Sequence, residues 1–408
     1  MVLNDDDPSL AAALDPATAV AVIGTGAMGS GIAQVAAQSG HTVHLVDAAP
    51  GAAQAARDRL GTTFERLVAK GKFTSAEATK TLDRLVVAES VAALPPVGLV
   101  IEAAREDLAT KRELFGDLEQ RQPAAVLATN TSSLDTSAIA DGLRHPDRLI
   151  GLHFFNPPAL MRLVEVIHGP HNATDAGREI LDQATDLVRR WGKTPVRCTS
   201  TPGFIVNRVA RPFYGEAQRM VGDGSIEPAT LDLAMRDAGF RMGPMELTDL
   251  IGQDVNLAVG TSVWEQTGRD PRYEPTDFQR DLVAAGRLGR KSGNGVFAYD
   301  ANGIAQNAHA DATRAATLSA AESPVVTNPV ARTLAMLVNE AVDLVARGEA
   351  TAEDVDTAMQ LGTNYPKGPF AWGQEIGFDT VADQLATLDR AFPGGRYRPS
   401  PALRQRRP

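Results

Sequence analysis

The sequence predicts an α/β protein: a doubly wound, mostly parallel sheet followed by two all-α domains that repeat each other. Short apolar runs alternate with helical stretches through the first 200 residues. After Pro202 the strand patterns fade and helical periodicity dominates. A segment that begins at Arg208 returns in similar form from Arg332. At 408 residues the chain is also too long for one ordinary core, so several domains are expected.

The composition is typical of a soluble globular protein. Hydrophobic residues make up 43%, and no run approaches the roughly 18 apolar residues of a membrane span. The net charge of −10 argues against nucleic acid or an anionic membrane as the main partner. Cys198 is the single cysteine, so no intrachain disulfide is possible and a cytoplasmic location is expected. The first residues carry three aspartates and no basic stretch, which predicts that residues 1–17 form a flexible tail rather than a signal peptide.

The histidines give no sign of a metal site. The seven histidines include two close pairs, His41/His44 and His168/His171. The first pair falls in a predicted strand, where a spacing of three directs the two side chains to opposite faces. We therefore expect no bound metal ion.

A glycine-rich turn near the N-terminus predicts a nucleotide site. Ala19–Ile23 is typical of a short buried strand, and the segment Ala27–Ser39 is typical of a helix that stops at Gly40. The turn between strand and helix has the pattern G-x-G-x-x-G, formed by Gly24, Gly26 and Gly29. Such glycines permit a tight turn and let a pyrophosphate approach the helix N-terminus, where Ala27 and Met28 begin the helix.

The residues after this helix complete the fingerprint of a Rossmann-type dinucleotide site. A second strand, His41–Val46, ends at Asp47. An acidic residue about 20 positions after the turn accepts the hydroxyls of an adenosine ribose. A carboxylate also repels the 2′-phosphate of NADP, so Asp47 favours NAD.

Five further apolar runs predict the rest of the sheet: Leu85–Ala88, Leu99–Ala103, Val126–Ala128, Leu149–Phe154 and Leu163–Ile167. Polar clusters follow three of these runs, including "EAAREDLATK" after Ile101 and "NTSSL" at Asn130–Leu134. In doubly wound sheets ligands bind beyond the carboxyl ends of the strands, so these clusters are candidates for the site. The simpler alternatives are a solvated helix for Glu106 and Lys111 and helix capping for the "NTSSL" hydroxyls.

His153 and Glu165 are the candidates for acid–base chemistry. His153 stands among apolar residues, and Glu165 interrupts an otherwise apolar run twelve positions later. A carboxylate in such a run is costly to bury unless it is paired. If the two runs are neighbouring strands, Glu165 can orient the imidazole and stabilise its protonated form.

The domain boundaries follow from these patterns. We expect a sheet domain at 18–201 and a change of domain near Thr201–Pro202. The remaining segments are a first helical copy at 202–300, a linker at 301–326, a second helical copy at 327–395 and a tail at 396–408. The linker assignment depends on the scarcity of large apolar residues after Asp300.

The two helical copies align with a single one-residue offset. Four matches define the alignment: Glu216 with Glu340, Asp232 with Asp356, Gly243-Pro244 with Gly368-Pro369, and Gly252 with Gly377. Asn207 precedes Arg208 in the first copy, whereas Ala331 precedes Arg332 in the second. If Asn207 takes part in chemistry, the second copy cannot repeat that role.

The motifs together resemble those of the L-3-hydroxyacyl-CoA dehydrogenases over residues 18 to about 300. The matching stretches are "VIGTGAMGSGIAQVAAQSGHTVHLVD", "NTSSL", "GLHFFNPPALMRLVEV", "TPGFIVNR", "GPMELTDLIGQD" and "GRKSGNGVFAYD". The duplicated C-terminal part and the ending "RYRPSPALRQR" are most similar to a subgroup, the 3-hydroxyadipyl-CoA dehydrogenases of bacterial phenylacetate degradation.

The resemblance implies a catalytic role for four residues. His153 would take the proton from the 3-hydroxyl, and Glu165 would bind the far nitrogen of its ring. Ser132 would hydrogen-bond the reacting oxygen. Asn207 would help to hold the substrate carbonyl.

The resemblance also implies binding residues. The cofactor NAD would be bound by Gly24, Gly26, Ala27, Met28, Gly29, Asp47, Glu106, Lys111 and Asn130. Thr63 and Lys70 would contact the coenzyme A handle, within a basic cluster that is otherwise explained as a solvated helical face.

The acyl chain is less determined than the reaction. A 3-hydroxyadipyl substrate carries a distal carboxylate, which favours a bidentate arginine. Arg162, Arg208, Arg211 and Arg241 lie near the motifs, and Arg241 is our first candidate. The alternatives are a 3-hydroxybutyryl-CoA dehydrogenase, a dehydrogenase of free hydroxy acids, and a non-catalytic NAD-binding protein on the same scaffold. The helical domains are expected to form either a homodimer or an intrachain pseudo-dimer.

Overall fold

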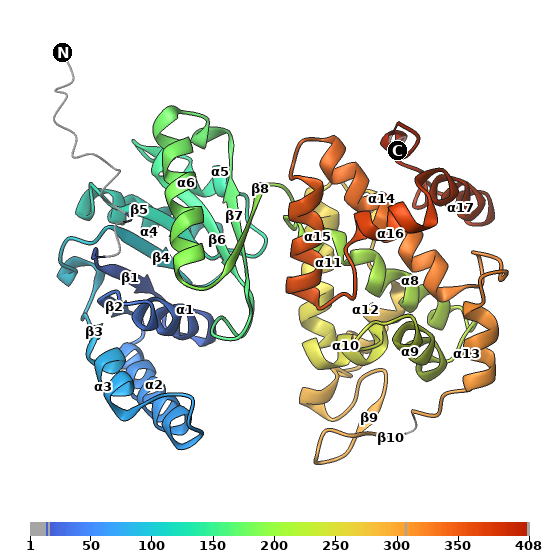
Figure 1. The fold of residues 1–408 in the computed structure, drawn as a ribbon, viewed down its shortest axis with the longest axis horizontal. Coiled ribbons are helices and arrows are strands. Elements are labelled where there is room, and N and C mark those ends of the chain that lie inside the picture. Colours follow the sequence, from blue (N-terminus) through green and yellow to red (C-terminus); the bar gives the residue numbers. More distant parts are fainter. Residues whose placement is uncertain (1–13, 15–16, 307, 406–408) are drawn as a thin grey trace. The chain divides into compact units, whose positions relative to one another are not determined.

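The computed structural model describes residues 14, 17–306 and 308–405, and the chain divides into two compact units (Figure 1). Unit 1 is Met1–Thr201 and unit 2 is Pro202–Pro408. Most of the N-terminal segment that the sequence predicts as a tail lies outside the described residues. Leu14 is described and buried, and its carbonyl accepts a hydrogen bond from Arg190 (3.0 Å).

Unit 1 is the predicted doubly wound sheet. Its eight strands run in the order β3-β2-β1-β4-β5-β6-β7-β8. The strands are β1 Val20–Ile23, β2 Val43–Val46, β3 Leu85–Val87, β4 Leu99–Glu102, β5 Val126–Thr129, β6 Leu149–Phe154, β7 Leu163–His168 and β8 Thr194–Thr199. The helices are α1 Ala27–Gln38, α2 Ala52–Ala69, α3 Ser75–Asp83, α4 Leu108–Arg121, α5 Thr136–Ala140 and α6 Asp175–Arg190.

Both faces of the sheet are covered, because successive side chains of a strand point to opposite faces. Val20 and Val22 of β1 pack in one apolar cluster with residues of α1 and α6. Ala21 and Ile23 pack in a second cluster with residues of α4 and α5. Strands buried on both faces explain why the apolar runs are continuous rather than alternating.

The sheet departs from a parallel arrangement at one place, where β7 runs antiparallel to β6. The edge strand β8 then pairs parallel with β7. The apolar runs of the sequence predict seven of the eight strands and miss β8. Its sequence, TPVRCT, contains Pro195 and Arg197, and half-buried positions interrupt its apolar pattern. An edge strand tolerates such residues because one side of its backbone is unpaired.

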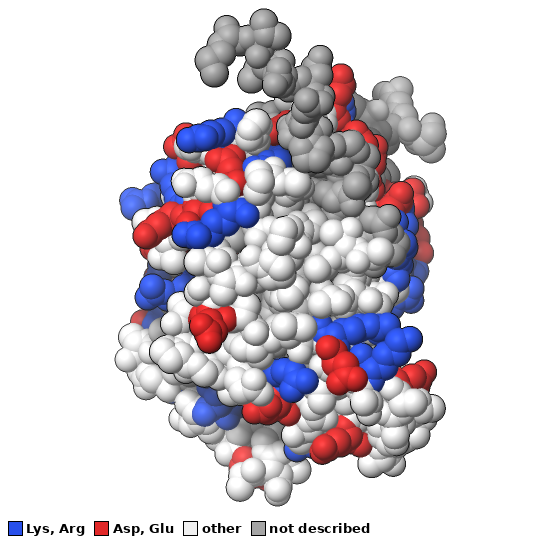
Figure 2. Space-filling view, turned by 90° about the vertical axis from the view of Figure 1, so that its left-hand side faces the viewer, with Lys and Arg blue, Asp and Glu red and all other residues white. Residues whose placement is uncertain are grey.

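Charged side chains of both signs are interspersed on the face of the molecule drawn in Figure 2. They surround a mostly uncharged centre, and no extended basic patch is visible in the coloured part of this face.

Unit 2 is mainly helical. Its helices are α7 Val206–Val209, α8 Arg211–Gly222, α9 Pro228–Asp237, α10 Pro244–Ile251, α11 Gln253–Gln266, α12 Asp277–Ala284, α13 Ala312–Ser319, α14 Pro329–Ala346, α15 Ala352–Thr363, α16 Pro369–Ile376 and α17 Phe378–Ala391. A two-stranded ribbon, β9 Ala298–Tyr299 and β10 Ala305–Gln306, follows α12.

The two copies share their internal hydrogen bonds. The Asp232 carboxylate accepts from the backbone amides of Met245 and Glu246 at the start of α10. Asp356 accepts in the same way from Phe370 and Ala371 at the start of α16. In both copies an aspartate on one helix therefore caps the next helix at its Gly-Pro start.

Two segments outside the two predicted helical copies differ from the prediction. The segment 301–326 is not only a linker, because it contains α13, which packs beside α9. Helix α13 buries Ala315 rather than a large apolar residue, so composition conceals its contact. The predicted tail at 396–408 begins with Arg396 and Tyr397, which are buried in unit 2.

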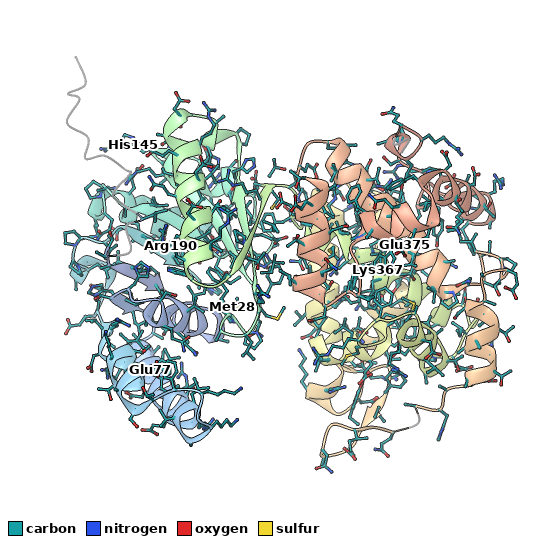
Figure 3. All side chains as sticks on the ribbon, viewed as in Figure 1. Met28, Glu77, His145, Arg190, Lys367 and Glu375 are labelled. Atoms are coloured by element: carbon teal, nitrogen blue, oxygen red, sulfur yellow. The ribbon has the colours of Figure 1, made fainter. Side chains whose placement is uncertain are left out.

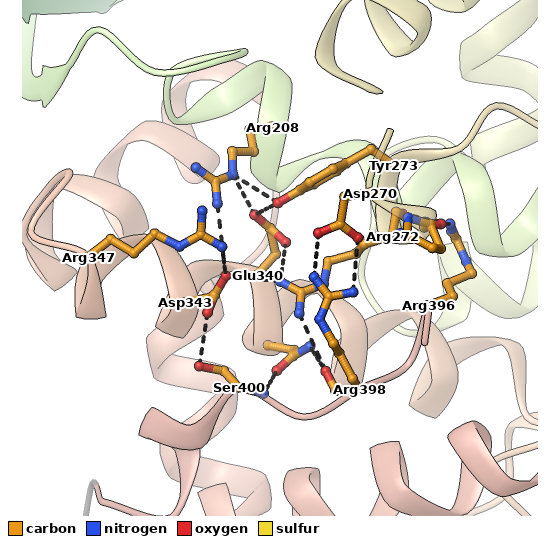
Figure 4. A network of polar contacts seen from close by, with 12 residues as sticks. Arg208, Asp270, Arg272, Tyr273, Glu340, Asp343, Arg347, Arg396, Arg398 and Ser400 are labelled. Atoms are coloured by element: carbon orange, nitrogen blue, oxygen red, sulfur yellow. Dashed lines mark hydrogen bonds and ion pairs between the residues drawn. The ribbon is translucent and has the colours of Figure 1, made fainter. Parts of the chain in front are cut away.

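Two buried glutamates join the copies reciprocally. Glu340 of α14 accepts hydrogen bonds from Arg208, Arg272 and Tyr273 of the first copy (Figure 4). Glu216 of α8 accepts from Arg332, Arg396 and Tyr397, which belong to the second copy and the segment after it. We call these sets the Glu340 cluster and the Glu216 cluster. Each copy thus supplies a carboxylate to two arginines and a tyrosine of the other.

Loss of one of these carboxylates is expected to destabilise unit 2 strongly. Glu216 is fully buried, and Glu216→Gln leaves Arg332 and Arg396 without their counter-ion. Chemical denaturation should show a loss of roughly 3–5 kcal/mol in the free energy of unfolding. The matched control is Glu375→Gln at the exposed pair with Lys367 (Figure 3), which should change stability by less than about 1 kcal/mol. Equal effects of the two variants would contradict the role of the Glu216 cluster.

The same cluster predicts an acid transition. Burial opposes ionisation of Glu216, but Arg396 and Arg332 outweigh it and lower its pKa from 4.5 to about 2. A carboxyl group with a lowered pKa stabilises the fold above its unfolded pKa, and the contribution is lost as the pH falls from 4.5 to about 2. Denaturation curves across this window should show this loss in the wild type and not in Glu216→Gln.

Candidate functional site

The glycine turn joins β1 to α1, and each glycine has a different reason to be there. Gly24 has φ +91°, and a Cβ atom on it would lie 2.6 Å from the carbonyl oxygen of Ala103. A Cβ on Gly29 would lie 1.8 Å from the carbonyl oxygen of Gly24. A Cβ on Gly26 would meet nothing within 4 Å. The first and third glycines therefore close the turn, whereas Gly26 leaves its outer side open to a ligand.

The turn opens into a cavity of about 840 Å³ at the carboxyl ends of β1, β2 and β4. The strand order reverses at β1, which pairs with β2 on one side and β4 on the other. This is the topological switch point at which doubly wound sheets bind ligands. The cavity is lined by Ile23, Gly24, Gly26, Val46, Asp47, Ala48, Glu89, Ser90, Val91, Ala103, Ala104, Arg105, Thr110, Glu113, Leu114 and Asp117. Its volume falls within the range of roughly 300–1,000 Å³ that is typical of small-molecule sites.

Asp47 lies in the wall of this cavity with its carboxylate fixed. One oxygen accepts from the amide and hydroxyl of Thr25 (2.7 and 2.8 Å), and the other accepts from the amide of Ala49 (2.9 Å). Partial burial opposes ionisation of Asp47, but the hydrogen bonds from Ala49 and Thr25 outweigh it and lower its pKa. Asp47 is therefore a held carboxylate at the end of β2, which suits it to accept ribose hydroxyls.

The other residues predicted to bind the cofactor lie outside the cavity wall. Ala27 is exposed on the first turn of α1, and Met28 packs partly against the apolar core (Figure 3). The side-chain oxygen of Asn130 accepts from the backbone amide of Phe154 (2.8 Å), so Asn130 ties the end of β5 to β6.

Lys111 is a buried structural residue rather than part of the cavity lining. Its ammonium lies 2.6 Å from Glu102 and 3.3 Å from Glu106. Glu102 also accepts hydrogen bonds from the amide of Ala104 and the hydroxyl of Thr129. Glu102 is not among the residues predicted from the sequence, although it is a carboxylate in an apolar run, which is the same signal that identifies Glu165.

Glu106 holds the loop that carries Ser132. One of its oxygens accepts from the amides of Ser132 (2.9 Å) and Ser133 (3.1 Å) and from the hydroxyl of Thr131 (2.6 Å). Burial opposes ionisation of Glu106, but the Thr131 hydroxyl and the Lys111 ammonium outweigh it and lower its pKa. The loop after β5 is therefore fixed by an ionised carboxylate. Its hydrogen bonds give Thr131 as well as the two serines of "NTSSL" a structural role.

His153 and Glu165 lie directly opposite each other on β6 and β7. His153 Nδ1 is 2.6 Å from Glu165 Oε2. His153 is 6% exposed and Glu165 is 0% exposed, so the pair is withdrawn from water. The imidazole ring centroid lies 4.5 Å from that of Phe155. When Nδ1–H donates to Glu165, the lone pair of the neutral ring lies on Nε2, where it can accept a proton.

Thr63 and Lys70 lie apart from the cavity. Thr63 is on α2 and donates its hydroxyl hydrogen to the carbonyl of Arg59 (2.9 Å). Lys70 follows the last residue of the same helix and is exposed. Thr63 and Lys70 are seven positions apart in the sequence, a spacing that places two residues on one helical face.

Two further predicted residues belong to unit 2. Asn207 is in α7, and its carbonyl accepts from Arg211 Nε (2.8 Å). Arg241 is exposed and lines a cavity of about 240 Å³. This cavity is also lined by Phe213, Phe240, Met242, Leu247, Leu250, Thr363, Asn364 and Tyr365. Tyr365 comes from the second copy, and its buried hydroxyl has no hydrogen-bond partner among the described residues.

Within the described ranges, no group of three or more His, Cys, Asp or Glu side chains could hold a metal ion. The helices of the same ranges include none with the length and hydropathy of a membrane span.

Comparisons with known proteins identify the family of this chain. A family model for the NAD binding domain of 3-hydroxyacyl-CoA dehydrogenase matches residues 19–201. The model for the C-terminal domain of the same family matches residues 203–299 and 329–407. The chain belongs to the 3-hydroxyacyl-CoA dehydrogenase family. It is accordingly an oxidoreductase with NAD as its cofactor, and the resemblance and fold class predicted from sequence are confirmed.

The relatives differ in how much of this chain they match. The 3-hydroxyadipyl-CoA dehydrogenase of Escherichia coli (strain K12) is 39% identical over 95% of this chain and 97% of its own length. The human mitochondrial hydroxyacyl-coenzyme A dehydrogenase is 39% identical over 69% of this chain and 90% of its own length. A crystal structure described as 3-hydroxybutyryl-CoA dehydrogenase from Escherichia coli K12 has a TM-score of 0.85 and 38% identity, and it covers 95% of this chain and 98% of that one.

The residues at the switch point fit NAD. The N-terminus of α1 has no side-chain cap, so its first amides are available to an anion. The open side of Gly26 gives a pyrophosphate room to approach these amides. Asp47 is an ionised carboxylate in the wall of the same cavity, and it would accept the hydroxyls of an adenosine ribose.

Alanine substitutions in the turn should separate binding from folding. In Gly26→Ala the new methyl group enters open space, so the melting temperature should stay within a few degrees while NAD binding weakens by roughly tenfold or more. In Gly29→Ala the new methyl group meets the backbone of Gly24, so the melting temperature itself should fall. Thermal unfolding and NAD titration of both variants test this. Unchanged NAD affinity in Gly26→Ala would exclude the turn as the pyrophosphate site.

Proposed function

We propose that this enzyme oxidises (S)-3-hydroxyadipyl-CoA to 3-oxoadipyl-CoA. The observation that carries the proposal for the reaction is the 2.6 Å contact between His153 and Glu165, on adjacent strands at the edge that also holds the dinucleotide turn. The substrate assignment draws support from the Escherichia coli relative of that name, which aligns over both helical copies.

His153 acts as the general base in this proposal. Its Nε2 takes the proton of the 3-hydroxyl as C3 is oxidised, and Glu165 stabilises the imidazolium that forms. Burial of the pair strengthens this stabilisation, because the effective dielectric constant is lower than in water. NAD, when bound, supplies the hydride acceptor.

Two hydrogen-bonding residues complete the catalytic set. Ser132 directs its hydroxyl at the reacting oxygen, and Glu106 keeps the Ser132 backbone in place. Asn207 holds the thioester carbonyl, and its own backbone is fixed by Arg211. Positioning by such groups lowers the entropic cost of reaching the transition state. Thr63 and Lys70 bind the coenzyme A handle from α2.

Arg241 is the proposed receptor for the distal carboxylate of the adipyl chain. It lines a mostly apolar cavity that suits a methylene chain, and it takes part in no ion pair among the described residues. Tyr365, whose buried hydroxyl has no hydrogen-bond partner among the described residues, lines the same cavity. Arg208, a competing candidate, is instead bound to Glu340 and Glu349.

A 3-hydroxybutyryl substrate is the second candidate, because the matching crystal structure and the Bacillus subtilis relative are described as 3-hydroxybutyryl-CoA dehydrogenases. A butyryl chain has no distal charge and needs no arginine.

We also propose that the helical copies form an intrachain pseudo-dimer, because the Glu216 and Glu340 clusters are reciprocal, and that the enzyme is cytoplasmic.

Steady-state NADH production from the two CoA esters tests the substrate proposal. We expect kcat/KM for 3-hydroxyadipyl-CoA to exceed that for 3-hydroxybutyryl-CoA by roughly tenfold or more, since a charge-assisted hydrogen bond contributes about 1.5–3 kcal/mol. In Arg241→Gln the adipyl value should fall by a similar factor, while the butyryl value stays nearly unchanged. A butyryl preference in the wild type would overturn the substrate. An adipyl preference that survives in Arg241→Gln would overturn only the role of Arg241.

A further inference from the structure

The Glu216 and Glu340 clusters have equivalent centres but different surroundings. Three residues after Glu340 stands Asp343, whereas three residues after Glu216 stands Arg219. Nine residues after Glu340 stands Glu349, whereas the matching residue of the first copy is Ser225. The repeat therefore replaces two carboxylates by a guanidinium and a hydroxyl.

This exchange removes counter-ions from one cluster. In the Glu340 cluster, the buried Arg208 and Arg272 lie within 4.0 Å of carboxylates of Glu340, Asp343 and Glu349. In the Glu340 cluster, three carboxylates therefore compensate the charges of two arginines.

The Glu216 cluster has the opposite balance. Glu216 is the carboxylate that pairs with both Arg332 and Arg396. Arg219 adds a third guanidinium, which interacts unfavourably with Arg396. Three arginines thus share one buried carboxylate.

Among the three arginines, Arg219 is the one whose charge is not paired with a carboxylate in an ion pair of the described residues. Its Nη2 donates to the backbone carbonyl of Glu274 (2.9 Å), and its Nε is buried without a hydrogen-bond partner among the described residues. No ion pair of the described residues includes Arg219. Burial and then the charge of Arg396 lower its pKa, and the carboxylates of Glu216 and Glu274 offset them only in part.

A cavity of about 620 Å³ lies beside these arginines. Arg219, Arg332 and Arg396 line it together with the aromatic rings of Phe278 and Phe392. Gln218 also lines it, is 3% exposed, and has its side-chain nitrogen buried without a partner among the described residues. The cavity is thus lined by aromatic rings and by two residues that each have a buried donor without a partner among the described residues, Arg219 Nε and Gln218 Nε2.

The other charged residues that line this cavity limit the kind of anion that it can bind. They are four exposed carboxylates: Asp223, Glu274, Asp277 and Asp281. The buried end of the cavity is therefore basic and its exposed end acidic. A polyanion would meet repulsion at the exposed end, whereas one carboxylate on an apolar body can place its charge at the buried end.

We propose that unit 2 contains a second ligand site, at which a small organic carboxylate binds with its charged group on Arg219 and Gln218 and its apolar body against Phe278 and Phe392. The site is distinct from the dinucleotide cavity of unit 1 and does not depend on the identity of the acyl substrate. Residues of both copies line it, so a bound carboxylate supplies the counter-ion that the first copy lacks and strengthens the contact between the copies.

Benzoate, its neutral analogue benzamide and inorganic phosphate are suitable probes for the full-length protein. Calorimetric titration should show binding of benzoate, with benzamide and phosphate at least roughly tenfold weaker, because one lacks the charge and the other lacks the apolar body. Benzoate should also raise the melting temperature. Arg219→Gln should weaken benzoate binding by roughly tenfold or more, and Arg390→Gln, at an exposed arginine of α17, should leave it unchanged.

Arg219→Asp gives the sharpest test, because it restores the residue found at the matching position of the second copy. Without ligand it should raise the melting temperature, since an aspartate supplies the missing counter-ion, and benzoate should no longer bind. The control Arg390→Asp, at an exposed arginine of α17, should do neither. The proposal is overturned if wild type fails to bind benzoate, if benzamide or phosphate binds as well, or if Arg219→Gln retains full affinity.

Discussion

A carboxylate that is buried in an apolar element must be paired, and this requirement organises the protein at four places. Glu102 and Glu165 end or interrupt apolar strands of the sheet, and Glu216 and Glu340 lie in the centre of the helical unit. Each is 0% exposed, and each is bound by a basic side chain. The cost of leaving any of them unpaired is several kcal/mol, so each fixes the position of its partner.

The pairings have different consequences in the two units. In unit 1, Glu102 fixes Lys111, which supports Glu106 and through it the Ser132 loop. Glu165 fixes His153 on the neighbouring strand, which requires β7 to run antiparallel to β6 in register. In unit 2 the pairings cross between copies, so the second copy contributes to the stability of the first even though it has Ala331 in place of Asn207. The surroundings of Glu216 differ from those of Glu340, and Arg219, which stands where the second copy has Asp343, lines a cavity.

Much of the fold follows from local patterns in the sequence. Seven strands are continuous apolar runs because both faces of the sheet are covered, and the glycine turn has the spacing that its steric contacts demand. The contact of His153 with Glu165 follows from the cost of burying Glu165. Strand β8 is not predicted from the sequence, because an edge strand tolerates Pro195 and Arg197, which interrupt its apolar pattern. Helix α13 is not predicted either, because the residue that it buries is the small Ala315. The Arg396–Glu216 bond joins residues 180 positions apart, which no local pattern reveals.

In the proposed mechanism Glu165 acts through His153, and steady-state kinetics with matched variants test this coupling. Glu165→Gln keeps the shape of the side chain and removes its charge. We expect kcat to fall by roughly 100-fold or more in Glu165→Gln and in His153→Gln, with the dissociation constant for NAD nearly unchanged. The double variant should be little worse than either single variant, since the two residues act as one unit. Near wild-type turnover in either single variant, or multiplicative losses in the double variant, would contradict this coupling.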